Sequence, residues 1–219
     1  MNRARYLRSG TIALALAGVL FALFPLTRPW QDSSGTDAGL VAATRDGWWV
    51  PSHLMGAGGF LLFAFASTAV LGVLMRGRGE PGARTMALLA MLGVGLILPY
   101  YGVESIGLHA VAASAELGDV GSRAALMGDM RNTPYGLTAC GLGLLAVATA
   151  GVFLAVGVWR AREGSAVPAI AVAVLLALYL PQYFGVPWLR IAHGIALGIS
   201  LLALAAWHRS VATRLLRNG

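Results

Sequence analysis

The sequence predicts an all-α integral membrane protein, a bundle of six transmembrane helices with both termini cytoplasmic. Hydrophobic residues make up 58% of the 219 residues and charged residues only 11%, whereas soluble domains average about 25% charged. The mean hydropathy is +0.73, and the apolar residues fall in blocks. Because one span needs about 20 mostly apolar residues, six spans would use roughly 120 residues and leave short loops.

The apolar blocks follow one another as a single transmembrane domain over 1–219. The first block follows a basic N-terminus and no A-x-A-like cleavage site comes after it, so we expect an uncleaved span. The third block is too long for one perpendicular span and contains Pro99. We therefore expect a partly buried extension, or a kinked and tilted helix. The polar stretch 116–133 predicts a loop with a short surface helix. The predicted spans are about 9–26, 51–75, 85–103 with an extension to about 115, 134–158, 167–184 and 188–207.

The arginines predict the orientation. All sixteen basic residues are arginine, which excludes a lysine Schiff base and a Walker lysine. If both termini lie on the cytoplasmic side of the cell membrane, eleven arginines are cytoplasmic and five are outside, as the positive-inside rule expects. The formal charge of +7 therefore indicates orientation, and no nucleic acid partner is implied. The inside set is Arg3, Arg5, Arg8, Arg76, Arg78, Arg84, Arg160, Arg162, Arg209, Arg214 and Arg217, and the outside set is Arg28, Arg45, Arg123, Arg131 and Arg190.

Most of the membrane-depth polar residues fall at the predicted outer ends of the spans, while His208 alone among the histidines is cytoplasmic. Ionisable groups at this depth usually mark a site, but interfacial aromatic residues also form an anchoring belt. A structural ion pair between Glu104 and Arg190 is an equally good reading of those two charges. The outer set comprises His53, His109, His193, Glu104, Arg190, Tyr100, Tyr101, Tyr183, Trp48, Trp49 and Trp188.

The sharpest pattern within this set is Tyr101, Ser105 and His109, which are four residues apart and share one helix face, with Glu104 adjacent. Ser105 would either orient the imidazole or bond the carbonyl four residues back. His53, His109 and His193 arise on three spans, so a bundle could converge them with Glu104 on a divalent metal. Any two could instead supply the axial nitrogens of a haem b.

The Ser105-x-x-x-His109 pair resembles the Ser-x-x-x-His element of the membrane-embedded zinc hydrolases that include alkaline ceramidases. Those proteins also use an acidic residue and two histidines four apart on the last helix. Here Leu189 and Leu197 stand four residues before and after His193. The resemblance therefore covers about five residues and lacks the histidine pair, so it does not indicate membership.

Three functions compete on this evidence. The first is a redox protein that holds haem b or a metal near the outer face for electron transfer. The second is an intramembrane enzyme that acts on a lipid or isoprenoid-like substrate. Glu104 would be its acid or base, with His109 or His53 as the second catalytic residue, and Ser105, Tyr101 and Arg190 would be further polar residues of the site. The third is a non-enzymatic transporter, or a subunit of a membrane complex or homo-oligomer. The single cysteine, Cys140, is expected to be a packing residue.

Overall fold

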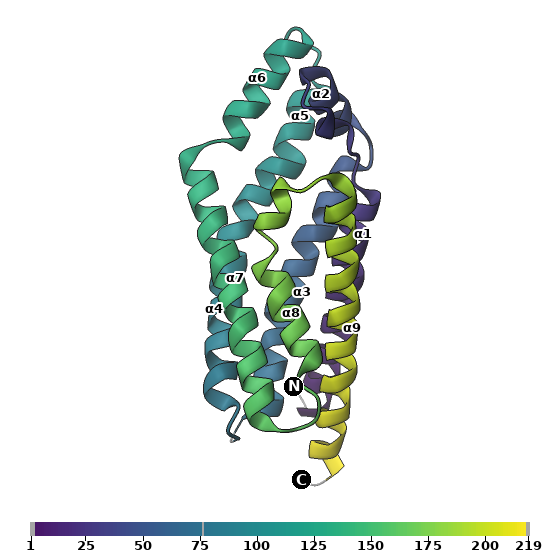
Figure 1. Cartoon of the computed structure of the whole chain (residues 1–219). Helices are drawn as coiled ribbons and strands as arrows, with labels where there is room; N and C mark the ends of the chain where they lie inside the picture. The colour runs from purple at the N-terminus through teal and green to yellow at the C-terminus, as the bar shows by residue number, and fades with distance from the viewer. Residues whose placement is uncertain (1–2, 76, 218–219) are drawn as a thin grey trace.

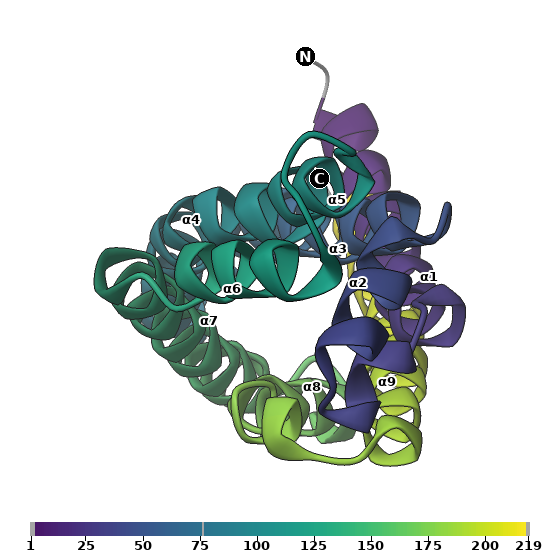
Figure 2. The same cartoon turned by 90° about the horizontal axis from the view of Figure 1, so that it is seen from above.

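In the computed structural model, the apolar segments form a closed ring of helices (Figures 1 and 2). The structure describes residues 3–75 and 77–217; Arg76, one of the arginines used to predict the orientation, lies outside them. Each segment contacts the next around the ring, in the order α1 (Arg3–Thr27), α3 (Trp49–Leu74), α4 (Glu80–Gly102), α7 (Pro134–Ala161), α8 (Val167–Ala177), α9 (Pro187–Arg217) and back to α1.

Five of the helices in the described part of the chain are long and apolar enough to cross a membrane, and α8 is shorter. Eleven residues of α8 rise about 16 Å, which is less than the roughly 30 Å of a hydrocarbon core. The predicted fifth span therefore holds a regular α-helix only as far as Ala177, and a turn with the short helix η3 (Pro181–Phe184) completes it. Pro181 explains this end, because its ring would clash with the carbonyl of Ala177 and it has no N–H to donate.

The third apolar block is helical beyond the predicted end of its span at about residue 103. The helix α4 runs through Pro99 and continues as one turn of π-helix, η2 (Val103–Gly107), followed by α5 (Leu108–Ala113). In that turn the amide of Leu108 donates to the carbonyl of Val103, five residues back. The extra residue in the turn changes the helical phase, so side chains before and after it no longer share one face.

The end of the bundle opposite the chain termini carries a cap of short helices (Figure 1). It consists of α2 (Asp37–Arg45), α5 and α6 (Val120–Arg131). The helix α6 lies within the stretch 116–133, where the sequence predicts a short surface helix. These helices share a small apolar core with the first turn of α3, so the cap is packed onto the bundle. That core consists of Val41, Ala43, Trp49, Leu108, Val111, Ala112, Ala124 and Met127.

Glycines allow two close, reciprocal helix contacts in the ring. A Cβ placed on Gly18 of α1 would lie 2.7 Å from the carbonyl oxygen of Gly198 of α9, and one placed on Gly198 would lie 2.6 Å from that of Gly18. Gly93 of α4 and Gly143 of α7 have the same reciprocal relation, at 2.7 Å each way. Small residues allow such close backbone contact between membrane helices, and Gly198 is the second glycine of a Gly194-x-x-x-Gly198 pattern in α9.

The outer surface of the ring is apolar. Leu88 and Leu92 on α4 and Ile199 on α9 are each more than 60% exposed, although soluble monomers rarely leave wide apolar patches in water. These faces fit a lipid bilayer environment and a multi-pass membrane protein. The first turn of α1 and the last turn of α9 lie at the same end of the bundle (Figure 1).

Candidate functional site

A polar cavity of about 210 Å³ lies at the capped end of the bundle, where α1, α3, α4, α6 and the segment between α8 and α9 meet. Its walls hold three guanidinium groups and two carboxylates, so the lining has one formal positive charge in excess. The lining residues are Phe24, Arg28, Asp32, His53, Tyr100, Tyr101, Glu104, Arg131, Tyr183 and Arg190.

Arg28, which follows directly on α1, forms an ion pair with Asp32 in the lining of the cavity. Its guanidinium donates to both carboxylate oxygens of Asp32, and its Nη1 lies 3.0 Å from Oδ1. The same guanidinium is placed over the ring of Trp30 at 4.4 Å and over that of Trp49 at 4.8 Å. The two indole faces and the carboxylate together hold a cation that is only 6% exposed.

Glu104 lies in the π-helical turn and forms a two-pronged ion pair with Arg131, the last residue of α6. Arg131 Nη2 lies 2.6 Å from Glu104 Oε1, and Nε lies 3.0 Å from Oε2. Burial lowers the pKa of Arg131, but the adjacent Glu104 carboxylate more than offsets this, so the pKa is raised above its ordinary value. The suggested ion pair between Glu104 and Arg190 is therefore wrong, because the cap brings a different arginine to the carboxylate.

Arg190 has no carboxylate partner among the described residues. It is half-buried, and its guanidinium lies 4.8 Å from the ring centre of Trp30 and 5.2 Å from that of Tyr183. Its Nε is buried and has no hydrogen-bond partner. Buried donors are nearly always satisfied in folded proteins, so this side chain has an unused capacity to bind an anion.

His53 is the one histidine that lines the cavity. Its ring is 3% exposed and packs between Trp49, at 4.2 Å between ring centres, and Phe24, at 5.2 Å. Nδ1 lies 2.7 Å from the carbonyl oxygen of Trp49. A carbonyl only accepts, so Nδ1 carries the proton that is donated. In the neutral ring Nε2 therefore has a free lone pair and can accept a proton or bond to a ligand.

Tyr101 belongs to a group of three tyrosine hydroxyls at the floor of the cavity. Its hydroxyl oxygen lies 3.3 Å from that of Tyr179 and 3.3 Å from that of Tyr183. Tyr179 and Tyr101 are each 4% exposed. The three hydroxyls satisfy one another in an otherwise apolar environment, which the aromatic rings of Phe21 and Phe60 complete.

The other predicted site residues bond to the backbone. His109 Nδ1 lies 2.7 Å from the carbonyl oxygen of Thr44 at the end of α2, and it does not line the cavity. Ser105 donates to the carbonyl oxygen of Tyr101 at 2.6 Å, the second of the two alternatives for that hydroxyl. His193 Nε2 lies 2.8 Å from the carbonyl oxygen of Leu175, whose ordinary helical donor, the amide of Tyr179, bonds elsewhere because α8 has ended.

No three histidine, cysteine, aspartate or glutamate side chains within residues 3–75 and 77–217 lie close enough together to hold a metal ion. The structure therefore gives no support to a centre built from His53, His109, His193 and Glu104. The cavity is also smaller than the roughly 300–1,000 Å³ of pockets for drug-sized ligands, so it gives no support to a bound haem b.

The sequence did not single out Arg28, Asp32, Arg131 or Tyr179 as site residues. Arg28 and Asp32 are four residues apart, a spacing that favours an ion pair on a helix, but they lie between the first two predicted spans, where no helix was expected. Arg131 reaches the site only because α6 folds back over the bundle. Comparisons with protein-family models, curated proteins and solved structures find no match to this chain.

Proposed function

We propose that the protein binds the anionic head group of a lipid or isoprenoid-like amphiphile in the cavity at the capped end, and acts on it as an intramembrane enzyme. The observation that carries this proposal is Arg190, a half-buried guanidinium without a carboxylate partner in the described residues. The other two arginines of the cavity are each neutralised by one carboxylate. An anion is therefore the ligand that completes the charge of the site.

The surroundings of Arg190 favour an amphiphile over a soluble anion. The segment from η3 to the start of α9, which supplies Tyr183 and Arg190 to the cavity, also exposes Phe184 to 89% and Trp188 to 69%. Exposed aromatic residues beside a charged group are typical of the membrane interface. A cavity of about 210 Å³ accommodates a head group, while the apolar chain of the ligand remains in the bilayer.

His53 supplies the chemistry in this proposal. Its Nδ1–H is committed to the carbonyl oxygen of Trp49, which leaves Nε2 as the proton acceptor next to the bound head group. Glu104 is occupied by Arg131 and holds that guanidinium in the wall. His53, one of the two histidines that the sequence suggested beside Glu104, therefore takes the acid–base role in place of Glu104.

Binding is tested with dodecyl phosphate added to the protein in dodecyl maltoside, followed through tryptophan emission, because Trp30 and Trp49 flank the arginines. Saturable binding is expected, with no comparable binding of uncharged dodecanol. Arg190→Gln should weaken binding about tenfold or more, since a hydrogen bond to a charged group contributes about 1.5–3 kcal/mol. Arg45→Gln, an exposed arginine of α2 outside the cavity, should bind as the wild type does. Equal binding by Arg190→Gln would refute the assignment.

Turnover is tested separately. The protein is reconstituted in vesicles of a bacterial polar lipid extract, and lipid products are measured by mass spectrometry. His53→Gln should abolish product formation while it retains dodecyl phosphate binding, and His109→Gln should leave product formation intact. Product formation by His53→Gln would refute the acid–base role of His53 and would leave the proposed binding site untouched.

A further inference from the structure

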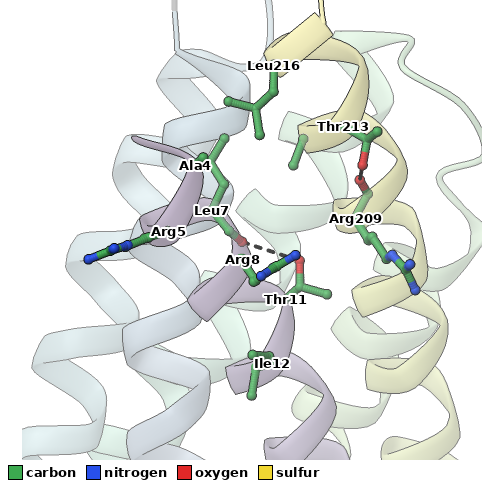
Figure 3. A pocket seen from close by; sticks show the side chains of 10 residues that line it. Ala4, Arg5, Leu7, Arg8, Thr11, Ile12, Arg209, Thr213 and Leu216 are labelled. Carbon is green, nitrogen blue, oxygen red and sulfur yellow. Dashed lines mark hydrogen bonds between the residues drawn. The ribbon is translucent and has the colours of Figure 1, made fainter. Parts of the chain in front are cut away.

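A second hollow lies at the other end of the bundle, between the first turns of α1 and the last turns of α9. Its volume is about 630 Å³, three times that of the cavity under the cap. Figure 3 shows Arg8 beside Thr11 between the two helices, with Arg5 and Arg209 extending from α1 and α9 at its sides. Its lining consists of Ala4, Arg5, Leu7, Arg8, Thr11, Ile12, Arg209, Ala212, Thr213 and Leu216.

The three arginines of this groove have no carboxylate partner within the described residues, and the groove has no acidic residue in its lining. Other arginines at the same end are paired, since Arg84 bonds Glu80 and Arg214 bonds Glu163. The lining of the groove therefore holds three positive charges without a carboxylate partner in the described part of the chain, whereas Arg84 and Arg214 are partly neutralised.

Apart from Thr11 and Thr213, the rest of the groove is apolar, and it faces outward. Ile12, one helical turn deeper than Arg8, is 52% exposed, and Leu216 is 43% exposed. An arginine cluster above an apolar helix face matches a phospholipid, which has a charged head and an acyl chain on one molecule. A soluble anion would make no use of the exposed apolar side chains.

The floor of the groove is fixed by a polar contact between its two helices. Thr11 Oγ1 of α1 lies 2.9 Å from Nδ1 of His208 of α9, and the His208 side chain is fully buried. Gly10, next to Thr11, packs against Ala69 of α3, so α1 is held on both sides. The groove is thus part of the packed bundle and does not depend on a ligand to form.

We propose that this groove binds an anionic phospholipid, with its phosphate at Arg5, Arg8 and Arg209 and an acyl chain along Ile12. Guanidinium groups bond phosphate oxygens in a two-pronged geometry, and basic pockets between membrane helices are known to take acidic lipid head groups. The lipid joins the first and last helices of the ring, at a site distinct from the cavity that contains Arg190.

The test uses protein in phosphatidylcholine vesicles that contain a trace of spin-labelled phosphatidylglycerol or spin-labelled phosphatidylcholine. Electron spin resonance gives the relative association constant of the two lipids. Phosphatidylglycerol should be preferred about fivefold, which corresponds to the ~1 kcal/mol expected for one basic residue near a membrane surface. Arg8→Gln with Arg209→Gln should remove the preference. Arg160→Gln with Arg162→Gln, which removes two arginines near the same end but outside the groove, should retain it.

A variant that changes no charge distinguishes lipid binding in the groove from attraction to the overall positive charge at this end of the bundle. Thr213→Trp fills the groove without changing any charge, and the Thr213 hydroxyl bonds only within α9, so the helix should be retained. This variant should also lose the preference. An unchanged preference in Thr213→Trp, an equal loss in the control pair, or displacement of the lipid by millimolar inorganic phosphate would each overturn the proposal.

Discussion

Arg131 and Glu104 join the cap to the bundle through two charge-assisted hydrogen bonds of 2.6 and 3.0 Å. The glutamate sits in the π-helical turn beyond α4 and the arginine is the last residue of α6. The same turn is held from the other side, because Trp49 Nε1 donates to the carbonyl oxygen of Glu104 at 2.8 Å. The position of the cavity wall therefore depends on contacts among three elements that are far apart in the sequence.

Breaking the pair should destabilise the protein. Glu104→Gln and Arg131→Gln each leave a mostly buried charge with a weaker partner, and each should lower the free energy of unfolding by about 1–3 kcal/mol. The double variant should lose less than the sum of the two. Thermal unfolding in detergent, followed by circular dichroism, measures the changes. Arg84→Gln is the control, since that exposed pair should contribute no more than about 0.5 kcal/mol. Strict additivity in the double variant would show that the pair is not coupled.

Two adjacent tryptophans should differ sharply. Trp49 is fully buried and donates to Glu104, whereas Trp48 is 55% exposed. Trp49→Phe removes that hydrogen bond and leaves a space, so it should cost about 1–3 kcal/mol. Trp48→Phe should leave the unfolding midpoint nearly unchanged. Equal midpoints for the two variants in differential scanning calorimetry would contradict the structural role of Trp49.

The contact between α1 and α9 should not tolerate a methyl group. Gly198→Ala places a Cβ 2.6 Å from the carbonyl oxygen of Gly18, so the helices must separate, at a cost of about 1–3 kcal/mol. Gly95→Ala has open space around its Cβ and should cause no loss. Both changes are read from unfolding in mixed micelles of rising dodecyl sulfate content. Equal stability of the two variants would mean that the helices are not in close contact.

The start of α6 should respond to acid. The Asp119 side chain accepts a hydrogen bond from the amide of Ser122 at 2.8 Å, and this bond lowers the pKa of Asp119 below its ordinary value of 3.8. Because the folded-state pKa is the lower one, the stabilisation is complete above pH 3.8 and is lost as the pH falls through the folded value. Asp119→Ala should speed amide hydrogen exchange in 120–131 at pH 7, and Asp119→Asn should do so much less. Unchanged exchange in Asp119→Ala would show that this cap does not stabilise α6.

Five of the six apolar blocks lie in helices long and apolar enough to cross a membrane, because the length and apolar character of a block are local signals. Pro99 does not interrupt the third block, since α4 runs through it. The end of α8 at Ala177 was not predicted, because apolar residues continue beyond it. Pro181 is the local signal for this end. The side of the membrane on which each end lies remains a prediction from the arginines.

The candidate site was predicted only in part, because its geometry depends on tertiary contacts. The sequence predicts that His53, Tyr101, Glu104 and Arg190 lie at the same end of the bundle, and all four line one cavity. The partner of Glu104 was not foreseen, since it comes from the cap and not from another span. Regular α-helical spacing predicts that His109 and Tyr101 share one helix face. The π-helical turn between them changes the helical phase, and His109 bonds to Thr44 instead.

The lipids that co-purify with the protein test the central claim most directly. Wild-type protein, Arg190→Gln and Arg45→Gln are extracted in the same mild detergent, and bound lipids are compared by mass spectrometry. We predict an anionic lipid or isoprenoid-like amphiphile that is retained by the wild type and by Arg45→Gln, and is depleted about tenfold or more in Arg190→Gln. The same lipid content in all three proteins would contradict an anion site at Arg190.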